Sequence, residues 1–312
     1  MTDRSLFQSI SIPAVEDRLR FFLHSVGKRL AASKKLTPEV CAQHIIDILK
    51  NPSLNDIDIL TQLATYITMD HPPKKKSTYR QTSRVADIEP ELDKVKAVHW
   101  NPHQRRLKPS FTYLDIGCSE GKITEAVAEA LNLSPSQAYA CDIMDNKHNE
   151  RHLYTFQKNT ITTLPYQDNA FELMTMFMSA HHFSDVHAMF DEAKRVGRPG
   201  AYLIMREHCD SDPANLPMNS AYYNIFHAIY ACTTLVKTPA ENTPDSFMEE
   251  YHRPGGYATY RSVADWSTIA LLHGFVQESE SHGPLAWNQP SKNIYEKDRL
   301  FDATYLWFRL SK

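Results

Sequence analysis

The sequence predicts an α/β fold in which a mostly parallel sheet is covered by helices on both faces, with a helical appendage in front of it. From about Phe111, short apolar segments alternate with helix-like segments, which is the pattern of parallel strands joined by helical crossovers. Residues 14–69 instead show apolar stripes at helical spacing. Near the C-terminus, two strand-like segments follow one another without a helix-like segment of adequate length between them. We therefore expect them to pair antiparallel at one sheet edge.

Three helices are expected in the appendage, which we assign to residues 1–70. The first has one apolar stripe whose members lie three or four residues apart: Val15, Leu19, Phe22, Val26 and Leu30. The second begins with Thr37 as N-cap and Pro38 at the first helical position. Its buried side is expected to hold Val40, Ile45, Ile46 and Leu49. The third is expected to start near Asn55 and to bury Ile57, Leu60, Leu63 and Ile67.

A basic linker or arm is expected over residues 71–110. Between Lys74 and Lys108 there are ten Lys and Arg residues against four Asp and Glu, a local balance of +6 in a chain whose net charge is −3. Aromatic residues and histidines are interspersed: Tyr79, His99, Trp100 and His103. Basic residues with such neighbours suit phosphates and stacked bases. A solvated linker has the same composition, so both interpretations stay open.

Composition excludes several classes of protein. Hydrophobic residues make up 42% and charged residues 23%, which is ordinary for a soluble globular protein. No apolar run approaches the roughly 18 to 20 residues of a membrane span, and the N-terminus shows no signal-peptide pattern. The five cysteines lie far apart with no CxxC pair, which argues against a disulfide framework or a zinc site and favours a reducing, cytoplasmic location. His148 and His152 could share a helix face, but no spacing predicts a metal site.

The main domain is expected over residues 111–312. Strands are expected at 111–117, 137–143, 171–179 and 198–208, with a further short segment at 158–166. Helices are expected at 123–133, 184–196 and 262–274, and the two final strands at 276–281 and 301–310. The stretch from Cys209 to Tyr260 is too long for a simple connection, so we expect an inserted, helix-containing cap at about 209–260.

The segment YLDIGCSEGKITEA (113–126) closes the first strand and opens a helix. In such sheets ligands bind outside the carboxyl ends of the strands, where glycine lets the backbone approach closely. The spacing Gly117-x3-Gly121 fits neither the dinucleotide fingerprint G-x-G-x-x-G nor the P-loop. It leaves a D-x-G-x-x-x-G loop that starts at Asp115, with a second acid, Asp142, at the end of the next strand.

This arrangement resembles the class I S-adenosylmethionine-dependent methyltransferases, particularly the methyltransferase type 11 group. LDIGCSEG is similar to the family's first motif, LPYQDNAFELMTMFMSAHHF to the stretch from the third motif through the fourth strand, and AKRVGRPGAYLIMREH to the fifth strand. The resemblance covers roughly residues 111–210 and the end of the chain. It implies a Rossmann-like, mostly parallel seven-stranded sheet with an antiparallel C-terminal strand, and S-adenosyl-L-methionine as cofactor.

The resemblance also implies roles for single residues. Asp115, Gly117 and Gly121 are expected to shape the loop around the methionine end of the cofactor, and Asp142 to accept hydrogen bonds from the ribose hydroxyls. Thr160 and Ile161 would flank adenine, and Ser179 and Ala180 would lie near the transferred methyl group. The full set of expected cofactor-binding residues is Asp115, Gly117, Cys118, Ser119, Gly121, Asp142, Ile143, Thr160, Ile161, Ser179 and Ala180.

Four residues are candidates for the chemistry because they fall at the carboxyl ends of the fourth and fifth expected strands: His181, His182, Glu207 and His208. Methyl transfer from a sulfonium mainly requires alignment, and a general base is needed only where the acceptor must lose a proton. Histidine titrates close enough to neutrality to take that proton.

The identity of the acceptor stays open between RNA and a small molecule. MFMSAHHF is loosely similar to an aromatic-x3-histidine segment of mRNA cap guanine-N7 methyltransferases, and the basic segment also favours RNA, so an RNA acceptor of the cap or viral type is our leading expectation. No Lys-Asp-Lys-Glu tetrad of the ribose 2′-O enzymes is present at the corresponding positions. The wider group mostly methylates small molecules, and the expected cap could cover one. A methyltransferase-like fold that binds without turnover is the alternative of another class.

Overall fold

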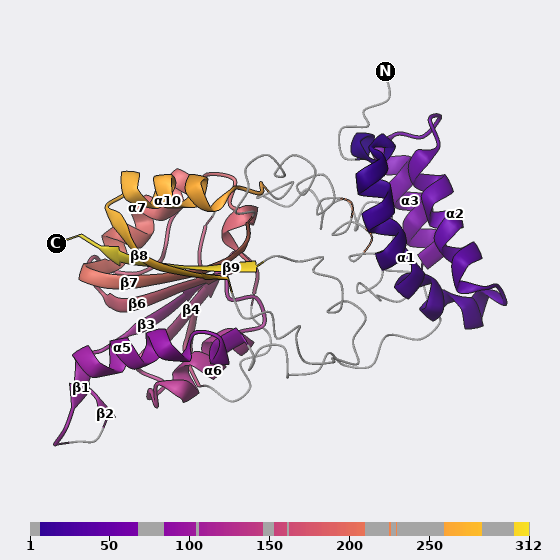
Figure 1. Cartoon of the computed structure of the whole chain (residues 1–312). Helices are drawn as coiled ribbons and strands as arrows, with labels where there is room; N and C mark the ends of the chain where they lie inside the picture. Colours follow the sequence, from indigo (N-terminus) through magenta and orange to yellow (C-terminus); the bar gives the residue numbers. More distant parts are fainter. Residues whose placement is uncertain are drawn as a thin grey trace. The chain divides into compact units, whose positions relative to one another are not determined.

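A computed structural model describes residues 7–67, 84–103, 106–145, 153–160, 162–209, 225, 229, 259–282 and 303–311. The chain divides into two compact units. In the described residues the first unit contains the N-terminal helices, and the second contains a seven-stranded sheet with its covering helices (Figure 1). We describe each unit by itself.

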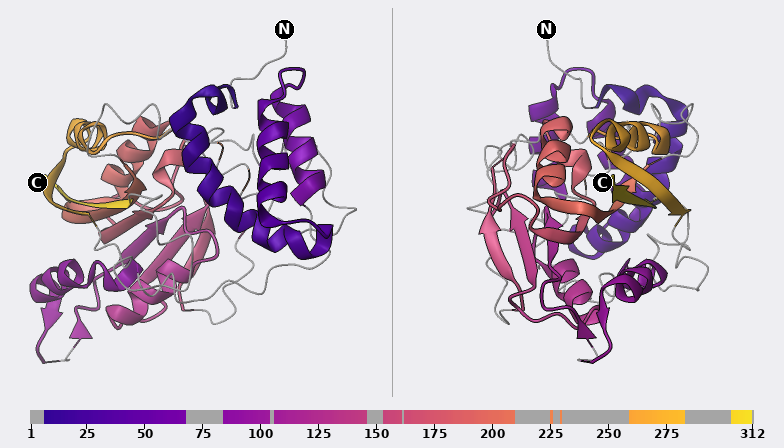
Figure 2. Two further views of the ribbon diagram at one scale, coloured as in Figure 1. Left: turned by 45° about the vertical axis from the view of Figure 1, so that its right-hand side comes forward. Right: turned by 90° about the vertical axis from the view of Figure 1, so that its left-hand side faces the viewer.

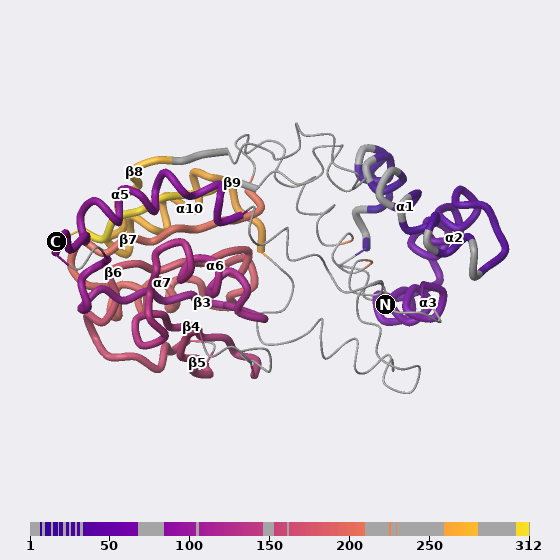
Figure 3. Tube along the Cα trace, turned by 90° about the horizontal axis from the view of Figure 1, so that it is seen from below, coloured from indigo at the N-terminus to yellow at the C-terminus, as the bar shows by residue number. Residues whose placement is uncertain are grey.

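Among the described residues 7–67, the first unit has a short 3-10 helix, η1 (Gln8–Ser11), and three α-helices: α1 (Pro13–Lys34), α2 (Pro38–Lys50) and α3 (Asp56–Ile67) (Figure 3). The predicted cap of α2 is confirmed, since the Thr37 side chain accepts a hydrogen bond from Val40 N and Pro38 follows it. Before α3, Asn55 Oδ1 accepts from Asp58 N at 2.8 Å, and Asp58 Oδ2 accepts from Asn55 N at 3.3 Å. This reciprocal pair satisfies two amide groups that a helix start leaves unpaired.

The predicted apolar stripes form most of the core among residues 7–67. The predicted burial of two stripe residues is wrong. Val15, Leu19, Val26 and Leu30 are buried on α1, and the side chain of Phe22 lies outside the described residues. Val40 is 49% exposed and Ile57 is 52% exposed, although both were expected on the buried side. The buried stripe of α2 passes through Cys41 and Ala42, which lie one helical turn before Ile45 and Ile46 and leave Val40 on the flank. Similarly, α3 turns Asp56 and Ile59 inward, so Ile57 points away from them.

The second unit is built on one sheet with the strand order β5-β4-β3-β6-β7-β9-β8. Its strands are β3 (Tyr113–Ile116), β4 (Ala138–Asp142), β5 (Thr155–Lys158), β6 (Phe171–Phe177), β7 (Gly197–His208), β8 (Phe275–His282) and β9 (Ala303–Leu310). The first five are parallel, and β9 pairs antiparallel with both β7 and β8. The expected Rossmann-like sheet with an antiparallel C-terminal strand is confirmed. The described part of the short segment expected at 158–166 is not a strand beyond its first residue, because the strand β5 lies earlier in the sequence, at Thr155–Lys158.

Helices cover both faces of this sheet (Figures 1 and 2). On one face α7 (Val186–Val196) and α10 (Val263–Leu272) pack through Met189, Phe190, Trp266 and Ile269 onto strand residues such as Met174. On the other face lie α5 (Glu89–His99) and α6 (Lys122–Ala130), with Leu92, Val95 and Val127 buried against strand residues such as Leu173. Strands enclosed in this way are mostly apolar, and every residue of β6 is buried, including its two polar residues, Glu172 and Thr175.

The described part of the expected linker is structured. Residues 84–111 contain α5 and a small hairpin of β1 (Trp100–Asn101) and β2 (Arg106–Leu107). Val85, Ile88, Leu92 and Val95 are buried in the second unit. Their spacing of three, four and three residues is helical, but the charged residues between them hid this pattern in the composition. Lys74, Lys75, Lys76 and Arg105 lie outside the described residues, as does most of the expected cap at 209–260.

Three further observations bear on composition-based expectations. Within the described part of the chain, no helix is both long and apolar enough to cross a membrane. The four described cysteines, Cys41, Cys118, Cys141 and Cys209, are buried, and none of them forms a disulfide with another. His148 and His152 lie outside the described ranges.

Candidate functional site

The loop between β3 and α6 is held in a conformation that few residues adopt. Gly117, Ser119 and Gly121 all have positive φ, at 76°, 50° and 73°. The loop is tied to β4 because Gly117 N and Cys118 N both donate to Cys141 O, at 2.9 and 3.0 Å. Gly121 is the N-cap of α6 and supplies no side-chain acceptor to the first N–H groups of this helix, which lie at the carboxyl end of the sheet.

Neighbouring protein atoms also leave no space for a side chain at either glycine of the loop. A Cβ at Gly117 would lie 2.5 Å from Ser179 Cβ, and one at Gly121 would lie 1.8 Å from the hydroxyl oxygen of Tyr154. Ser179 follows β6, and its hydroxyl donates to Ile116 O at 2.9 Å. The spacing Gly117-x3-Gly121 therefore serves both the left-handed turn and the close packing of Ser179 and Tyr154 against it.

Asp142 joins the loop to the end of β4. Its Oδ2 accepts from Ser119 N at 2.8 Å, and its Oδ1 accepts from Met144 N at 2.9 Å. Each carboxylate oxygen has a second lone pair, so the half-buried side chain can still accept from a ligand's hydroxyl groups. Ile143, the next residue, is half-buried beside it.

Asp115 faces the protein interior instead. It accepts from Thr124 Oγ1 on α6 at 2.7 Å and from Thr175 Oγ1 on β6 at 2.8 Å. Because Thr175 donates to Asp115, the Tyr113 hydroxyl, 2.8 Å away, must donate to Thr175. Burial raises the pKa of Asp115 to about 6, against the two threonine hydrogen bonds, which lower it. This carboxyl group therefore ties β3, β6 and α6 together beneath the loop.

The candidate catalytic residues meet at the carboxyl ends of β6 and β7. Glu207 on β7 is fully buried, and its Oε1 accepts from Ala180 N at 2.7 Å. Its Oε2 pairs with Nδ1 of His181, which is 2% exposed and belongs to the short 3-10 helix η2 (Ala180–His182). The turn before η2 contains Met178 at φ 58°, a backbone conformation that non-glycine residues rarely adopt and that is often associated with functional sites.

Three further rings surround His181. Tyr260 stacks on it with ring centroids 5.5 Å apart and an interplanar angle of 20°. His182 and His208 lie 4.1 and 5.7 Å from it, again between ring centroids. His208 and Tyr260 are buried, whereas His182 is exposed. The four predicted residues thus do come together, with His181 and Glu207 at the centre.

The remaining predicted cofactor residues are divided between the loop and β5. Cys118 and Ala180 are buried beside the loop and the η2 turn. Thr160, just beyond β5, is exposed, and its hydroxyl accepts from Thr162 N at 3.4 Å. Ile161 lies outside the described residues. Whether any of these residues binds a cofactor stays a prediction.

Sequence reasoning missed four residues of this region: Thr124, Thr175, Tyr154 and Tyr260. Thr175 is an isolated polar residue in an apolar segment, a signal that could have marked it as the partner of a buried acid, whereas Thr124 lies next to the charged Glu125 and gives no such signal. Tyr154 and Tyr260 carry no local signal. They reach the site only through the tertiary fold.

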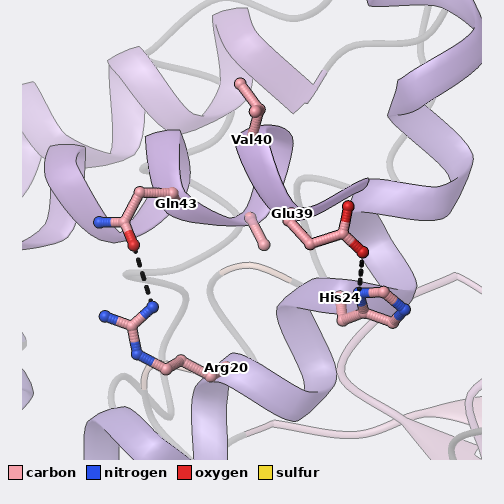
Figure 4. A pocket seen from close by; sticks show the side chains of 6 residues that line it. Arg20, His24, Glu39, Val40 and Gln43 are labelled. Atoms are coloured by element: carbon pink, nitrogen blue, oxygen red, sulfur yellow. Dashed lines mark hydrogen bonds and ion pairs between the residues drawn. The ribbon is translucent and has the colours of Figure 1, made fainter. Parts of the chain in front are cut away.

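The first unit has a separate open groove between α1 and α2, lined by Arg20, His24, Glu39, Val40, Ala42 and Gln43 (Figure 4). Its polar side chains bind one another: Arg20 Nη1 donates to Gln43 Oε1 at 3.0 Å, and His24 Nδ1 lies 3.4 Å from Glu39 Oε1. Arg20 also pairs with Glu16. Because these groups satisfy one another, we do not take the groove as the functional site.

Comparison with known proteins agrees with the resemblance over the central part of the chain. Residues 114–205 match the model of a methyltransferase domain family. This segment runs from β3 into β7 and includes the loop, Asp142 and the η2 turn. It is less than half of the chain.

Curated relatives match over similar stretches. The chain is 26% identical over 121 residues to sterol 24-C-methyltransferase ERG6B of Gibberella zeae, covering 36% of this chain and 32% of that protein. It is 37% identical over 59 residues to the uncharacterized methyltransferase YcgJ of Bacillus subtilis, covering 19% of this chain and 23% of that protein. The chain thus spans about a third or less of the length of these relatives.

Two solved structures are similar at low identity. A geranyl diphosphate methyltransferase, solved with geranyl diphosphate and sinefungin, has a TM-score of 0.47 and 12% identity, covering 68% of this chain and 73% of that one. An S-adenosylmethionine-dependent methyltransferase from Aquifex aeolicus has a TM-score of 0.40 and 15% identity, covering 76% of this chain and 100% of that one.

Proposed function

We propose that this protein is an S-adenosylmethionine-dependent methyltransferase. The observation that carries the proposal is the loop of 117–121 beside Asp142, at the carboxyl ends of β3 and β4, within the segment that matches a methyltransferase domain. A ligand with a ribose and an amino-acid end suits this place, because Asp142 offers acceptors and the start of α6, whose N-cap Gly121 has no side chain, offers backbone N–H donors. When bound, S-adenosylmethionine supplies a methyl group already activated on a sulfonium.

In this proposal the residues act mainly by positioning. Asp142 holds the ribose hydroxyls through the acceptor capacity that Ser119 N and Met144 N leave free. Asp115 shapes the loop from below through Thr124 and Thr175 without touching the ligand. Ser179, at the turn after β6, lies against the loop at Gly117, and with Ala180 it would border the place of the acceptor.

A small organic molecule is the acceptor that the geometry supports best. The acceptor-side groups Glu207, His181, His208 and Tyr260 are buried, which suits a compact acceptor in an enclosed site. The likeness to a sterol methyltransferase over the shared segment points in the same direction.

RNA, our leading expectation from the sequence, is the second candidate, including a cap guanine-N7 acceptor. The observation that favours it is the β1–β2 hairpin, where Trp100 is 42% exposed near the exposed side chains of Arg106 and Lys108. Burial, and after it the positive charges of Lys108, Arg198 and Arg309, lower the pKa of His99 at the base of this hairpin. However, the hairpin leads into the amino end of β3, at the opposite end of the strands from the loop.

Transfer of labelled methyl from S-adenosylmethionine tests both candidates side by side. Capped RNA, uncapped RNA and a deproteinised metabolite extract serve as acceptors for the full chain. We expect label in the extract fraction. Label in capped RNA alone would favour the second candidate. Donor binding with no label in any fraction would instead favour the non-catalytic binding protein.

The hairpin provides a matched test of the RNA candidate. If RNA binds there, Arg106→Gln with Lys108→Gln should weaken binding and flatten its dependence on salt, because fewer counterions are released. Lys96→Gln is the control, since Lys96 already pairs with Asp93 at 2.9 Å. If the double substitution leaves RNA affinity unchanged, the hairpin is not an RNA-binding site.

A further inference from the structure

We propose that Glu207 is a positioning residue that fixes His181 as a general base, and that the methyl acceptor is therefore a hydroxyl or amine that loses a proton on transfer. This inference rests on the proposed methyl transfer and goes beyond it by assigning separate roles to two residues and a chemical class to the acceptor. The observation behind it is the fully enclosed pair between Glu207 and His181.

The two oxygens of Glu207 have different partners. Oε1 accepts from the backbone N–H of Ala180, at 2.7 Å, and thus holds the turn that follows β6. Oε2 pairs with His181 Nδ1. The carboxylate therefore fixes both the backbone of η2 and the ring that this short helix carries, while Tyr260 stacks on the face of that ring.

The contact determines which ring nitrogen is basic. A carboxylate is an acceptor, so the imidazole nitrogen that faces it carries a proton. In neutral His181 that proton is on Nδ1, and the basic lone pair is then on Nε2. A carboxylate that orients an imidazole in this way also stabilises the imidazolium form once Nε2 has taken a proton.

Holding the turn alone does not require this arrangement. A glutamine at position 207 could accept from Ala180 N equally well, without burying an ionisable carboxyl group. Burying a carboxylate costs desolvation free energy, and a hydrogen bond that only holds a turn recovers little of that cost. The pair is better explained by chemistry that uses a proton.

Other ionisable groups lie around the pair. His182 on η2 and His208 on β7 are near the His181 ring, Tyr260 stacks on it, and the charge of Arg261 interacts with Glu207. Burial lowers the pKa of Arg261, against the carboxylates of Asp265 and Glu207, which raise it. Cys209 follows His208 on the same strand end, and burial raises the pKa of its thiol.

The step is balanced as follows. The acceptor oxygen or nitrogen forms a bond to the methyl carbon while the bond from that carbon to sulfur breaks, and its electron pair stays on sulfur, which becomes a neutral thioether. The acceptor's proton moves to His181 Nε2 and is later released to solvent. No oxidant or reductant is required.

Nitrogen NMR of the full chain with labelled histidine tests the positioning role without any acceptor. We expect His181, assigned by its loss in His181→Asn, to be protonated on Nδ1 and unprotonated on Nε2 at neutral pH. In Glu207→Gln the amide oxygen can keep the Ala180 hydrogen bond while the amide NH₂ group faces Nδ1. The proton of His181 should therefore move to Nε2.

Glu172→Gln is the matched control. Glu172 is another buried carboxylate that accepts from a backbone N–H, that of Thr112 at 2.8 Å, and it pairs with Arg198 near the opposite end of β6. The His181 signals should not change in this variant. A wild-type His181 protonated on Nε2, or a Glu207→Gln spectrum like that of the wild type, would overturn the proposal.

Two measurements separate this proposal from the proposed function. Titration with S-adenosylmethionine should give the same affinity for Glu207→Gln as for the wild type, because Glu207 lies on the acceptor side. A wild type that does not bind the donor would refute the proposed function, whatever the tautomer of His181. In the labelled-transfer experiment, an O- or N-methyl product supports the acceptor class, and a C- or S-methyl product contradicts it.

Discussion

At the scale of single residues, the two acids of the site differ in what they face. Asp115 and Asp142 end neighbouring strands and look equivalent in the sequence. In the fold, Asp115 is enclosed by Thr124 and Thr175, whereas Asp142 is half-buried and bound to two backbone N–H groups of loops. Asp115 therefore ties β3, β6 and α6 together, whereas Asp142 can also bind a ligand.

Replacing Asp142 by alanine should weaken S-adenosylmethionine binding by about 1 to 3 kcal/mol, because the ribose hydroxyls lose a charged acceptor. Part of this loss comes from the loop, since Ser119 N loses its partner as well. Calorimetric titration measures the effect. Asp145→Ala is the control, because Asp145 lies three residues further on, is exposed and pairs with Lys158. Equal affinities of the two variants would contradict the role of Asp142.

The raised pKa of Asp115 predicts a pH dependence of stability. With a pKa of about 6 in the fold and 3.8 as the reference, the folded state holds more protons than the unfolded state between these values. The stability contributed by this group therefore falls as pH rises from about 4 to about 6, by about 3 kcal/mol in total for two pKa units. Urea unfolding of the wild type and of Asp115→Asn at several pH values measures it as a difference. A constant difference between pH 4 and 7 would contradict the assignment.

At the scale of elements, the β3–α6 loop depends on what packs against it. Gly117 and Gly200 both have positive φ, at 76° and 81°, but only Gly117 has protein atoms where a Cβ would be. Backbone strain alone should cost Gly200→Ala roughly 1 to 2 kcal/mol. Gly117→Ala adds overlap with Ser179, so it should cost about 1 to 3 kcal/mol more. Chemical denaturation measures both.

A second substitution decides the cause of the loss at Gly117. Ser179→Gly removes the atoms that a Cβ at position 117 would meet, so it should recover part of the stability of Gly117→Ala. No recovery would mean that backbone strain, not packing, makes glycine necessary there.

The elements also show which parts of the fold the sequence predicts. Strands such as β6 and helices such as α7 have continuous apolar runs or clear helical stripes, and both were expected at nearly the observed bounds. α5 was missed because charges dominate its segment, although Val85, Ile88, Leu92 and Val95 keep helical spacing. Val40 and Ile57 were assigned to the wrong side because an apolar residue next to a stripe is not always part of it.

For the site, the sequence predicted which residues lie at the carboxyl ends of the strands, but it did not predict the contacts between them. Gly117, Asp142, His181 and Glu207 stand out because each lies at or just after the carboxyl end of a strand. The pairing of Glu207 with His181 joins positions 26 residues apart, and Tyr260 comes from the end of the expected cap. Such contacts depend on the order of strands in the sheet, which local patterns do not encode.

At the scale of the whole molecule, the second unit contains the features on which the proposed function depends. The loop, Asp142 and the Glu207–His181 pair all lie at the carboxyl ends of β3, β4, β6 and β7. The basic hairpin precedes β3 and lies at the other end of the same sheet. This separation is the structural reason for favouring a small acceptor over RNA.

The central claim is that the carboxyl ends of β3 and β4, with the loop after β3, bind S-adenosylmethionine. Calorimetric titration of the full chain with this compound tests it most directly, with its demethylated product as competitor. We predict one site per chain with a dissociation constant below about 1 mM, in the range of enzyme substrates, competition by the product, and clear weakening by Asp142→Ala. The absence of binding up to that concentration, or binding that Asp142→Ala does not change, would contradict the account.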